Sequence, residues 1–200
     1  MKKIILTSCG IIDDKLKQEF IKLLDNKNIE AIKLLYITTA VDGESDPDKS
    51  WVDEEYKTIL DLGIKEENIT EFKLDYDIDF NKYDAIYMMG GNTFYLMKKI
   101  RENNWIDKII SAINNGIIYI GSSAGSEILS KSIETALGYD ENNVNITDFT
   151  GLNIVDGLVI PHSNRKQKFI EECKGKYSDK IYTIEDKHGF IIIDGNENYY

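Results

Sequence analysis

Short apolar runs alternate with segments of helical periodicity along most of this chain. We predict strands at residues 3–7, 31–38, 69–74, 84–89 and 117–120, and helices at residues 13–24, 51–62 and 105–113 and after residue 93. This alternation is typical of an α/β fold, in which a mostly parallel sheet is sandwiched between two layers of helices. In such folds, functional sites lie at the carboxyl ends of the strands.

The last part of the chain is less regular. A polar segment at 138–150 precedes a predicted strand at 158–160, a helix at 165–176, and short strands at 181–183 and 190–193 that we expect to be partly antiparallel at an edge. The 200 residues are 42% apolar and contain no linker, repeat or low-complexity tract. A single domain over residues 1–200 is therefore expected.

The net charge and the N-terminal residues make some classes of protein unlikely. The 35 acidic residues against 24 basic ones give a net charge of -11, which disfavours a nucleic-acid partner. The apolar run that opens the chain is too short for a signal peptide, and no stretch is long enough to span a membrane, so we expect a cytoplasmic protein. Cys9 and Cys173 are too few for a disulfide framework and lack metal-like spacing, and Cys9 is interpreted as a small buried residue rather than a reactive thiol.

The segment YIGSSAGS places a GxSxG pattern between a predicted strand and a helix. The pattern consists of Gly121, Ser123 and Gly125. A sharp strand-to-helix turn exposes a serine hydroxyl at the carboxyl edge of a sheet, so Ser123 is the candidate nucleophile. The alternative is a plain Gly/Ser loop that leads into a helix.

A serine nucleophile requires a base, and the chain has only two histidines. His162 follows directly on a predicted strand end, whereas His188 lies in a predicted hairpin turn, where a solvated surface histidine is expected. The imidazole needs a carboxylate to orient it. Glu185, just after the strand at 181–183, is the first choice, and Asp140 is the second, although either one could be a surface charge.

Two backbone amides are candidates for an oxyanion hole. The amide of Ala124 lies at the start of a predicted helix, and Gly91 lies in a GGN segment at the end of another strand. An alternative interpretation of GGN is a simple turn in which Asn92 or Thr93 caps the following helix. The two interpretations are compatible.

Three motifs, MMGGNTFYL, IGSSAGS and IPHSN, follow one another at distinct strand ends. In this order and spacing the chain resembles the peptidase S51 family, which includes dipeptidase E and cyanophycinase. The resemblance implies a flavodoxin-like α/β sandwich similar to class I glutamine amidotransferases. It also implies Ser123 as nucleophile, His162 as base, Glu185 as the acid, and Gly91 with Ala124 as the oxyanion hole, with Asp140 still open as the acid.

The chain departs from dipeptidase E in the segment after His162, where SNRKQKF is shorter than the family's substrate-pocket segment. The resemblance therefore supports serine peptidase chemistry better than a preference for aspartyl dipeptides. Asn92 and Arg165 are candidate substrate-binding residues. Alternatively, Arg165 and Lys166 form the solvated first turn of a helix.

The leading hypothesis is a serine peptidase that hydrolyses short peptides through a Ser-His-Glu/Asp triad. One alternative is an α/β-hydrolase-type esterase, which would use His188 as the base because its triad runs nucleophile, acid, histidine. Another is a non-catalytic, amidotransferase-like binding module. No metal cluster or dinucleotide fingerprint is visible, so no metal or cofactor is expected, and the expected partner is a small peptide substrate, with a homodimer left open.

Overall fold

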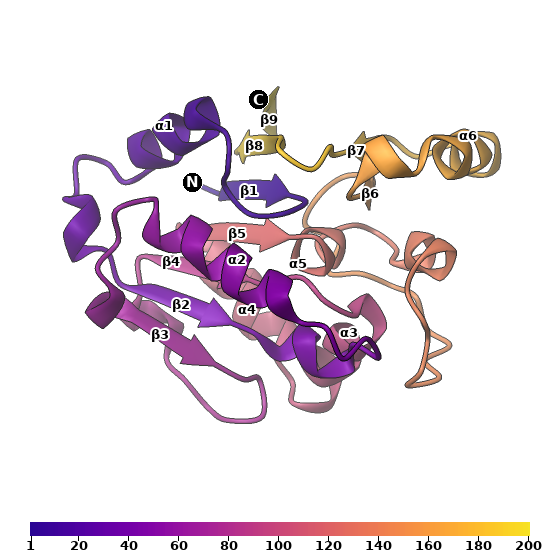
Figure 1. Ribbon diagram of the computed structural model, residues 1–200, viewed down its shortest axis with the longest axis horizontal. Helices are drawn as coiled ribbons and strands as arrows, with labels where there is room; N and C mark the ends of the chain where they lie inside the picture. The colour runs from indigo at the N-terminus through magenta and orange to yellow at the C-terminus, as the bar shows by residue number, and fades with distance from the viewer.

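A seven-stranded sheet forms the centre of the molecule in a computed structural model that describes residues 1–200 (Figure 1). The strand order is β3-β2-β4-β5-β1-β8-β9, in which the first five strands are parallel and β8 and β9 are antiparallel. The strands are β1 (Lys3–Thr7), β2 (Leu34–Ile37), β3 (Ile69–Phe72), β4 (Ala85–Met88), β5 (Ile118–Ser122), β8 (Gly189–Ile193) and β9 (Asn196–Tyr199). The expected parallel sheet with an antiparallel edge is confirmed.

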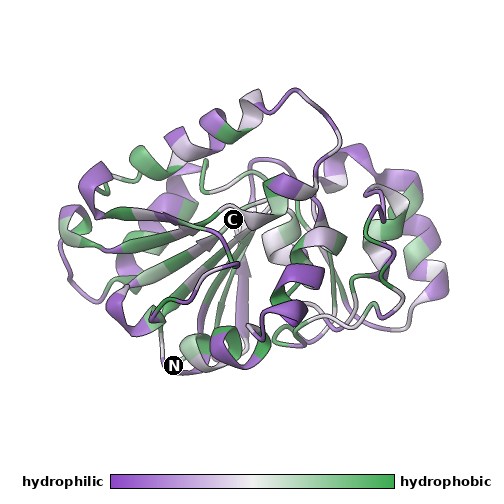
Figure 2. Ribbon diagram, turned by 90° about the horizontal axis from the view of Figure 1, so that it is seen from below, coloured by the Kyte–Doolittle hydropathy of each residue, from purple (hydrophilic) through white to green (hydrophobic).

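Helices cover both faces of this sheet and bury two separate apolar clusters. One face packs against α1 (Asp14–Leu23) and α2 (Ser50–Leu60), and the other packs against α3 (Thr93–Glu102) and α4 (Ile106–Asn114). Side chains alternate along a strand, so Ile4 and Leu6 enter one cluster while Ile5 enters the other. In Figure 2 the apolar strands lie between helices whose outer surfaces are polar. The fold is thus the expected three-layer α/β sandwich.

A second, two-stranded sheet lies apart from the central one. Its strands β6 (Leu158–Ile160) and β7 (Ile181–Thr183) run parallel, and α6 (Gln167–Lys176) connects them. Both strands were expected from the sequence, but the strand at 181–183 was expected at the antiparallel edge with 190–193, and instead it pairs in parallel with β6. This small sheet lies beyond the carboxyl ends of β1 and β5 (Figure 1), and its own carboxyl end faces the same region.

The helix after the GxSxG motif is short. α5 spans only Ala124–Glu127, a single turn. The segment 138–150 contains no strand and little helix, as expected. None of the helices combines the length and the apolar character needed to cross a membrane.

Candidate active site

Ser123 lies on a strained turn between β5 and α5. Its backbone has φ 46° and ψ −111°, a conformation that non-glycine residues rarely adopt. The flanking glycines permit this turn because a Cβ on Gly121 would lie 2.6 Å from the carbonyl oxygen of Gly125, and one on Gly125 would lie 2.0 Å from the carbonyl oxygen of Met88. The GxSxG segment therefore forms the strand-to-helix elbow expected from the sequence.

Hydrogen bonds to the end of β1 hold the elbow in place. The N–H of Ser123 donates to the carbonyl oxygen of Thr7 at 3.0 Å. The hydroxyl of Ser126 accepts from the N–H of Thr7 at 2.9 Å and lies 2.8 Å from the carbonyl oxygens of Thr7 and Gly121. Since Ser126 is fully buried, these contacts fix the position of the Ser123 side chain.

His162 connects the hydroxyl of Ser123 with a carboxylate. Its Nε2 lies 3.0 Å from Ser123 Oγ, and its Nδ1 lies 2.7 Å from Asp186 Oδ1. The small β6–β7 sheet brings the two side chains together because His162 and Asp186 both follow its paired ends, where the N–H of Ile184 donates to the carbonyl oxygen of Ile160. The imidazole is therefore held between an alcohol and an acid.

Ser8, the residue after β1, ties this small sheet to the central one. Its hydroxyl accepts from the N–H of His162 at 2.9 Å and donates to the carbonyl oxygen of Ile184 at 2.9 Å. The Ser8 side chain is buried and is the acceptor for the N–H of His162, while the carbonyl oxygen of Ile184 also accepts from the N–H of Ser163 at 2.8 Å. One buried hydroxyl thus positions both segments that carry the histidine and the acid.

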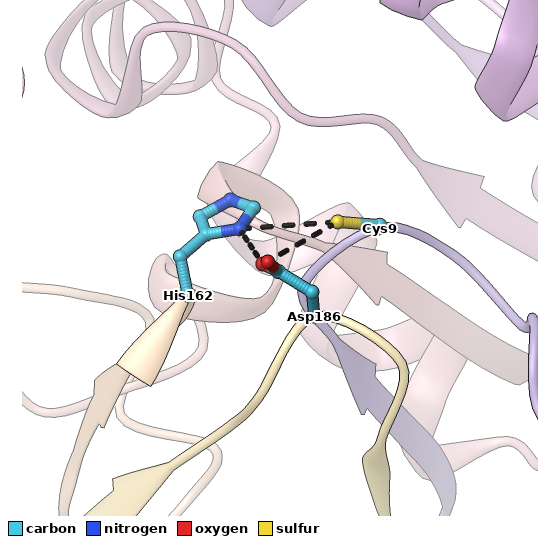
Figure 3. Close-up of side chains that lie close together, drawn as sticks. All are labelled: Cys9, His162 and Asp186. Atoms are coloured by element: carbon cyan, nitrogen blue, oxygen red, sulfur yellow. Dashed lines mark hydrogen bonds and ion pairs between the residues drawn. The ribbon is translucent and has the colours of Figure 1, made fainter. Parts of the chain in front are cut away.

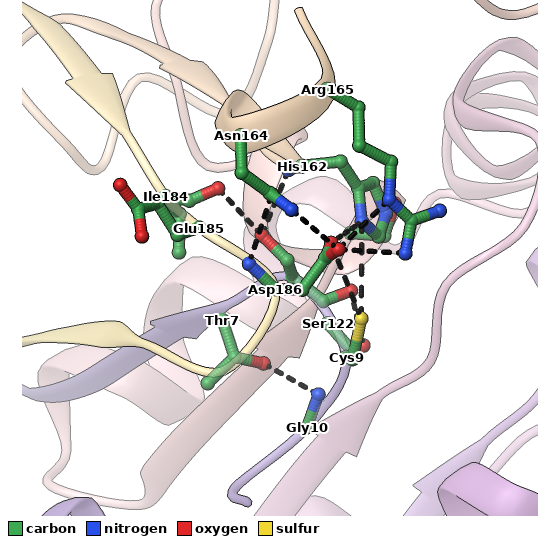
Figure 4. A network of polar contacts seen from close by, with 12 residues as sticks. Thr7, Cys9, Gly10, Ser122, His162, Asn164, Arg165, Ile184, Glu185 and Asp186 are labelled. Atoms are coloured by element: carbon green, nitrogen blue, oxygen red, sulfur yellow. Dashed lines mark hydrogen bonds and ion pairs between the residues drawn. The ribbon is translucent and has the colours of Figure 1, made fainter. Parts of the chain in front are cut away.

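The carboxylate against His162 belongs to Asp186 and not to Glu185, which corrects the expectation from the sequence. Oδ2 of Asp186 accepts from Nδ2 of Asn164 at 2.9 Å and from Nε and Nη2 of Arg165 at 2.8 and 2.7 Å. The two acids lie in the turn that follows β7, where the N–H of His188 donates to the carbonyl oxygen of Glu185 at 3.1 Å, and in Figure 4 Glu185 is turned away from the imidazole. Sequence reasoning missed Asp186 because it directly follows another acid.

Glu185 contacts the other histidine instead. Its carboxylate lies 3.6 Å from Nδ1 of His188, whose ring stacks on Tyr199. His188 contacts neither Ser123 nor Asp186, as the sequence interpretation of a surface residue implied. The geometry therefore gives no support to the α/β-hydrolase-type alternative, in which the triad residues follow one another along the chain as nucleophile, acid and histidine.

Burial and hydrogen bonding set the charges of His162 and Asp186. Burial would raise the pKa of Asp186, but hydrogen bonds from Asn164, His162 and Arg165 outweigh it and lower that pKa to about 2. Burial lowers the pKa of His162 below its usual 6.5, although Asp186 opposes this effect. At neutral pH, His162 is therefore a neutral imidazole that can accept a proton, beside an ionised carboxylate.

The two amides expected to form an oxyanion hole are available. The N–H of Gly91 donates no hydrogen bond within the protein, and that of Ala124 is the first of α5, where no helical acceptor exists. Gly91 has φ +130°, and a Cβ there would lie 2.5 Å from the carbonyl oxygen of Ala40, so only glycine fits. Gly91 and Ser123 both line the same cavity.

Three other candidate residues are bound within the protein and do not take the substrate-binding or triad roles considered for them. Asn92 is buried and caps α3 by accepting from the N–H of Tyr95 at 2.9 Å, so it does not face the cavity and the N-cap interpretation is correct. Asp140 accepts from the N–H of Thr93 at 2.8 Å and forms no hydrogen bond with His162. Arg165 lines the cavity, but its guanidinium is bound to Asp186.

Cys9 also approaches the histidine and its acid. Its Sγ lies 3.8 Å from both Nδ1 of His162 and Oδ1 of Asp186 (Figure 3). These three side chains are close enough together to share a metal ion. However, burial and the nearby carboxylate of Asp186 raise the pKa of Cys9 to about 12, which disfavours the thiolate that metal binding and nucleophilic attack both require.

The cavity beside Ser123 has a volume of about 620 Å³, and acidic residues outnumber lysine and arginine in its wall by six to two. One of its lining residues, Glu55 of α2, is only 8% exposed and was not singled out from the sequence. A signal was present, because Glu55 stands one helical turn before the buried Ile59, on the apolar stripe of that helix. A carboxylate on such a stripe is unusual and indicates a specific partner.

Comparisons with known proteins agree with this geometry. The sequence model of Peptidase family S51 matches residues 4–198. The chain belongs to peptidase family S51. As a member of this family it is a serine-type peptidase, and the resemblance noted in its motifs is confirmed.

Individual relatives are similar along much or all of the chain. An uncharacterized peptidase of Listeria monocytogenes is 32% identical, covering 98% of this chain and 97% of its own length. A peptidase E of Haemophilus influenzae is 36% identical over 55% of this chain and 51% of its own length. The crystal structure of a protein from Listeria monocytogenes that is provisionally assigned as a peptidase E superposes with a TM-score of 0.82, at 26% identity, over 100% of this chain and 98% of that one.

Proposed function

We propose that this S51 peptidase hydrolyses short peptides, with Ser123 as nucleophile, His162 as general base and acid, and Asp186 as the residue that orients the imidazole. The observation that carries the proposal is the unbroken hydrogen-bonded path from Asp186 through His162 to Ser123, at 2.7 and 3.0 Å. A serine hydroxyl becomes nucleophilic when a neutral imidazole accepts its proton, and a carboxylate on the far nitrogen holds the required tautomer.

The reaction proceeds in two halves. Ser123 Oγ attacks the scissile carbonyl carbon while its proton passes to Nε2 of His162, and the resulting oxyanion accepts hydrogen bonds from the amides of Gly91 and Ala124. When the tetrahedral intermediate collapses, the C–N bond breaks, and Nε2 returns the proton to the leaving amine. Water then attacks the acyl-serine and gives its proton to His162, which restores the Ser123 hydroxyl as the acid product leaves.

The size of the cavity favours short substrates. A volume of about 620 Å³ is in the range of small-ligand pockets and holds a few residues of peptide. The strained turn aims Ser123 into this cavity, so the peptide bond has to enter it to react. Relatives named peptidase E support peptides as the class of substrate.

The chain's two histidines offer a matched test. With a panel of dipeptides as substrates, Ser123→Ala and His162→Ala should each lower kcat by at least about 10⁴-fold, because the triad residues act as a unit. His188→Ala, the control, should stay within about threefold of wild type. Thermal unfolding of all three variants checks that the fold is intact.

The result also separates the alternatives. An esterase that uses His188 as its base would show the opposite pattern in the two histidine variants. A non-catalytic binding module would give no turnover with any peptide in the wild-type protein. Full activity in a folded Ser123→Ala variant would rule out the proposed mechanism.

A further inference from the structure

Glu55 is a buried carboxylate in the catalytic cavity with no positively charged partner. It lies on α2, is 8% exposed, and accepts a hydrogen bond from the hydroxyl of Tyr87 at 2.9 Å on Oε1. No lysine, arginine or histidine forms an ion pair with it. Buried charges in proteins are normally paired, because desolvation of an unpaired charge costs several kcal/mol. An unpaired carboxylate that lines the cavity therefore indicates a cation supplied by the ligand.

The groups that face Glu55 carry no charge. They are the hydroxyl of Tyr87 on β4, the hydroxyl of Ser122 on β5, the amide of Gly90 and the thiol of Cys9 after β1. The hydroxyls and the amide stabilise the carboxylate through hydrogen bonds but do not neutralise it. Burial still raises the pKa of Glu55 to about 7 in spite of these hydrogen bonds, so the carboxylate lacks the counter-ion that would hold it ionised.

Gly90 separates Glu55 from the nucleophile by a distance that suits one amino-acid residue. A Cβ on Gly90 would stand 3.1 Å from Cβ of Ser123, and Oε2 of Glu55 lies 3.9 Å from the same point. Cβ of Ser123 and Oε2 of Glu55 are therefore no farther apart than the sum of these two distances. In an amino acid, the α-nitrogen lies about 2.5 Å from the carbonyl carbon. An α-ammonium group can thus reach Glu55 while its own carbonyl carbon lies against Ser123.

The rest of the cavity favours a cation over an anion. Arg165 is bound to Asp186, and the ammonium of Lys166 lies 3.1 Å from the centre of the Tyr139 ring, so both cations of the cavity are already engaged within the protein. Further carboxylates line the wall, and clefts lined by one sign of charge attract ligands of the other sign. These residues are Glu44, Asp46, Asp48, Glu54 and Asp140.

We propose that Glu55 binds the free α-ammonium group of the peptide's first residue, which makes the enzyme an exopeptidase for peptides with a neutral or basic first residue. This inference rests on the proposed role of Ser123. It implies that blocking the amine abolishes recognition, and that an aspartyl or glutamyl first residue is disfavoured by the acidic wall. Substrate recognition here thus differs from a preference for aspartyl dipeptides.

The test compares Glu55→Gln with Asp53→Asn. Asp53 is another acid of α2, but it is exposed and does not line the cavity. The substrates are alanyl-, lysyl- and aspartyl-p-nitroanilide together with N-acetyl-alanyl-p-nitroanilide. Wild type should favour the free amines of alanine and lysine by at least tenfold over both the acetylated and the aspartyl substrate.

Glu55→Gln should lower kcat/KM for alanyl-p-nitroanilide on the order of 10- to 100-fold, the usual cost of a hydrogen bond to a charged group. It should leave the acetylated substrate and the rate of labelling by a fluorophosphonate, which carries no amine, within about threefold of wild type. Asp53→Asn should change all rates less than about threefold. The glutamine side chain can still accept from Tyr87, so the variant is expected to fold.

Two results would overturn the role of Glu55. One is equal loss of activity by Glu55→Gln on free and acetylated substrates, which indicates a structural role. The other is wild-type activity on acetylated or aspartyl substrates that matches the activity on alanyl substrate. Either result leaves the role of Ser123 intact, because that role fails only if the Ser123→Ala variant keeps its activity.

Discussion

Replacing Asp186 by asparagine should inactivate the enzyme through the tautomer of His162. Oδ2 of Asp186 is surrounded by three N–H donors from Asn164 and Arg165, so the carbonyl oxygen of an asparagine will take that position. Its NH₂ group then faces Nδ1 of His162, which has to accept rather than donate. The imidazole proton moves to Nε2, and this nitrogen can no longer accept the proton of Ser123.

The expected loss in kcat is about 10⁴-fold, the cost of the wrong tautomer in a comparable triad, and it corresponds to about 5 kcal/mol of transition-state stabilisation. The assay is steady-state hydrolysis of an alanyl substrate by Asp186→Asn, with thermal unfolding as a check on the fold. Glu185→Gln is the matched control, since this neighbouring acid faces His188, and it should stay within about threefold of wild type. An equal loss in the two variants, or less than a tenfold loss in Asp186→Asn, would refute this assignment of the acid.

Three further predictions concern the supports of the site and its pH dependence. Ser8→Ala removes a buried hydroxyl with two partners and should lower the free energy of unfolding by about 1–3 kcal/mol, which should be seen as a lower Tm together with a lower kcat. An unchanged Tm would argue against the link that Ser8 makes between the small sheet and the central one. Gly125→Ala would place a methyl group 2.0 Å from a carbonyl oxygen of β4 and should destabilise the protein by at least about 1–3 kcal/mol in denaturant unfolding. Wild-type stability of this variant would contradict the close approach of Gly125 to β4. Burial raises the pKa of Glu55 to about 7 and lowers that of His162 below 6.5, so kcat/KM for free-amine substrates should rise with pH as both groups lose protons. Glu55→Gln should move the acid limb of this pH profile to lower pH. An acid limb that does not move would contradict the role of Glu55.

The central sheet and half of the site could be predicted because local patterns determine them. Apolar runs mark β1, β4 and β5, and small residues at their ends mark where the backbone turns closely. Ser123 stands in a motif whose geometry follows from its glycines, and His162 is one of only two histidines and directly follows a strand. These signals lie within a few residues of one another along the chain.

The acid of the site could not be predicted because its position depends on pairing between distant strands. Glu185 and Asp186 are adjacent and chemically alike, and the turn that follows β7, closed by the N–H of His188 on the carbonyl oxygen of Glu185, decides which of them faces His162. Glu55 presents a related difficulty, because its helix and the cavity wall meet only in the folded protein, although its place on the apolar stripe of α2 was visible in the sequence.

Covalent labelling by a fluorophosphonate reports most directly whether Ser123 is an activated nucleophile. The wild-type protein is incubated with the probe, digested, and analysed by mass spectrometry to locate the adduct. We expect one adduct on the peptide that contains Ser123, slowed at least about 100-fold in His162→Ala and absent in Ser123→Ala. An adduct on another residue, or equal labelling of wild type and His162→Ala, would contradict the proposed catalytic role of these two residues.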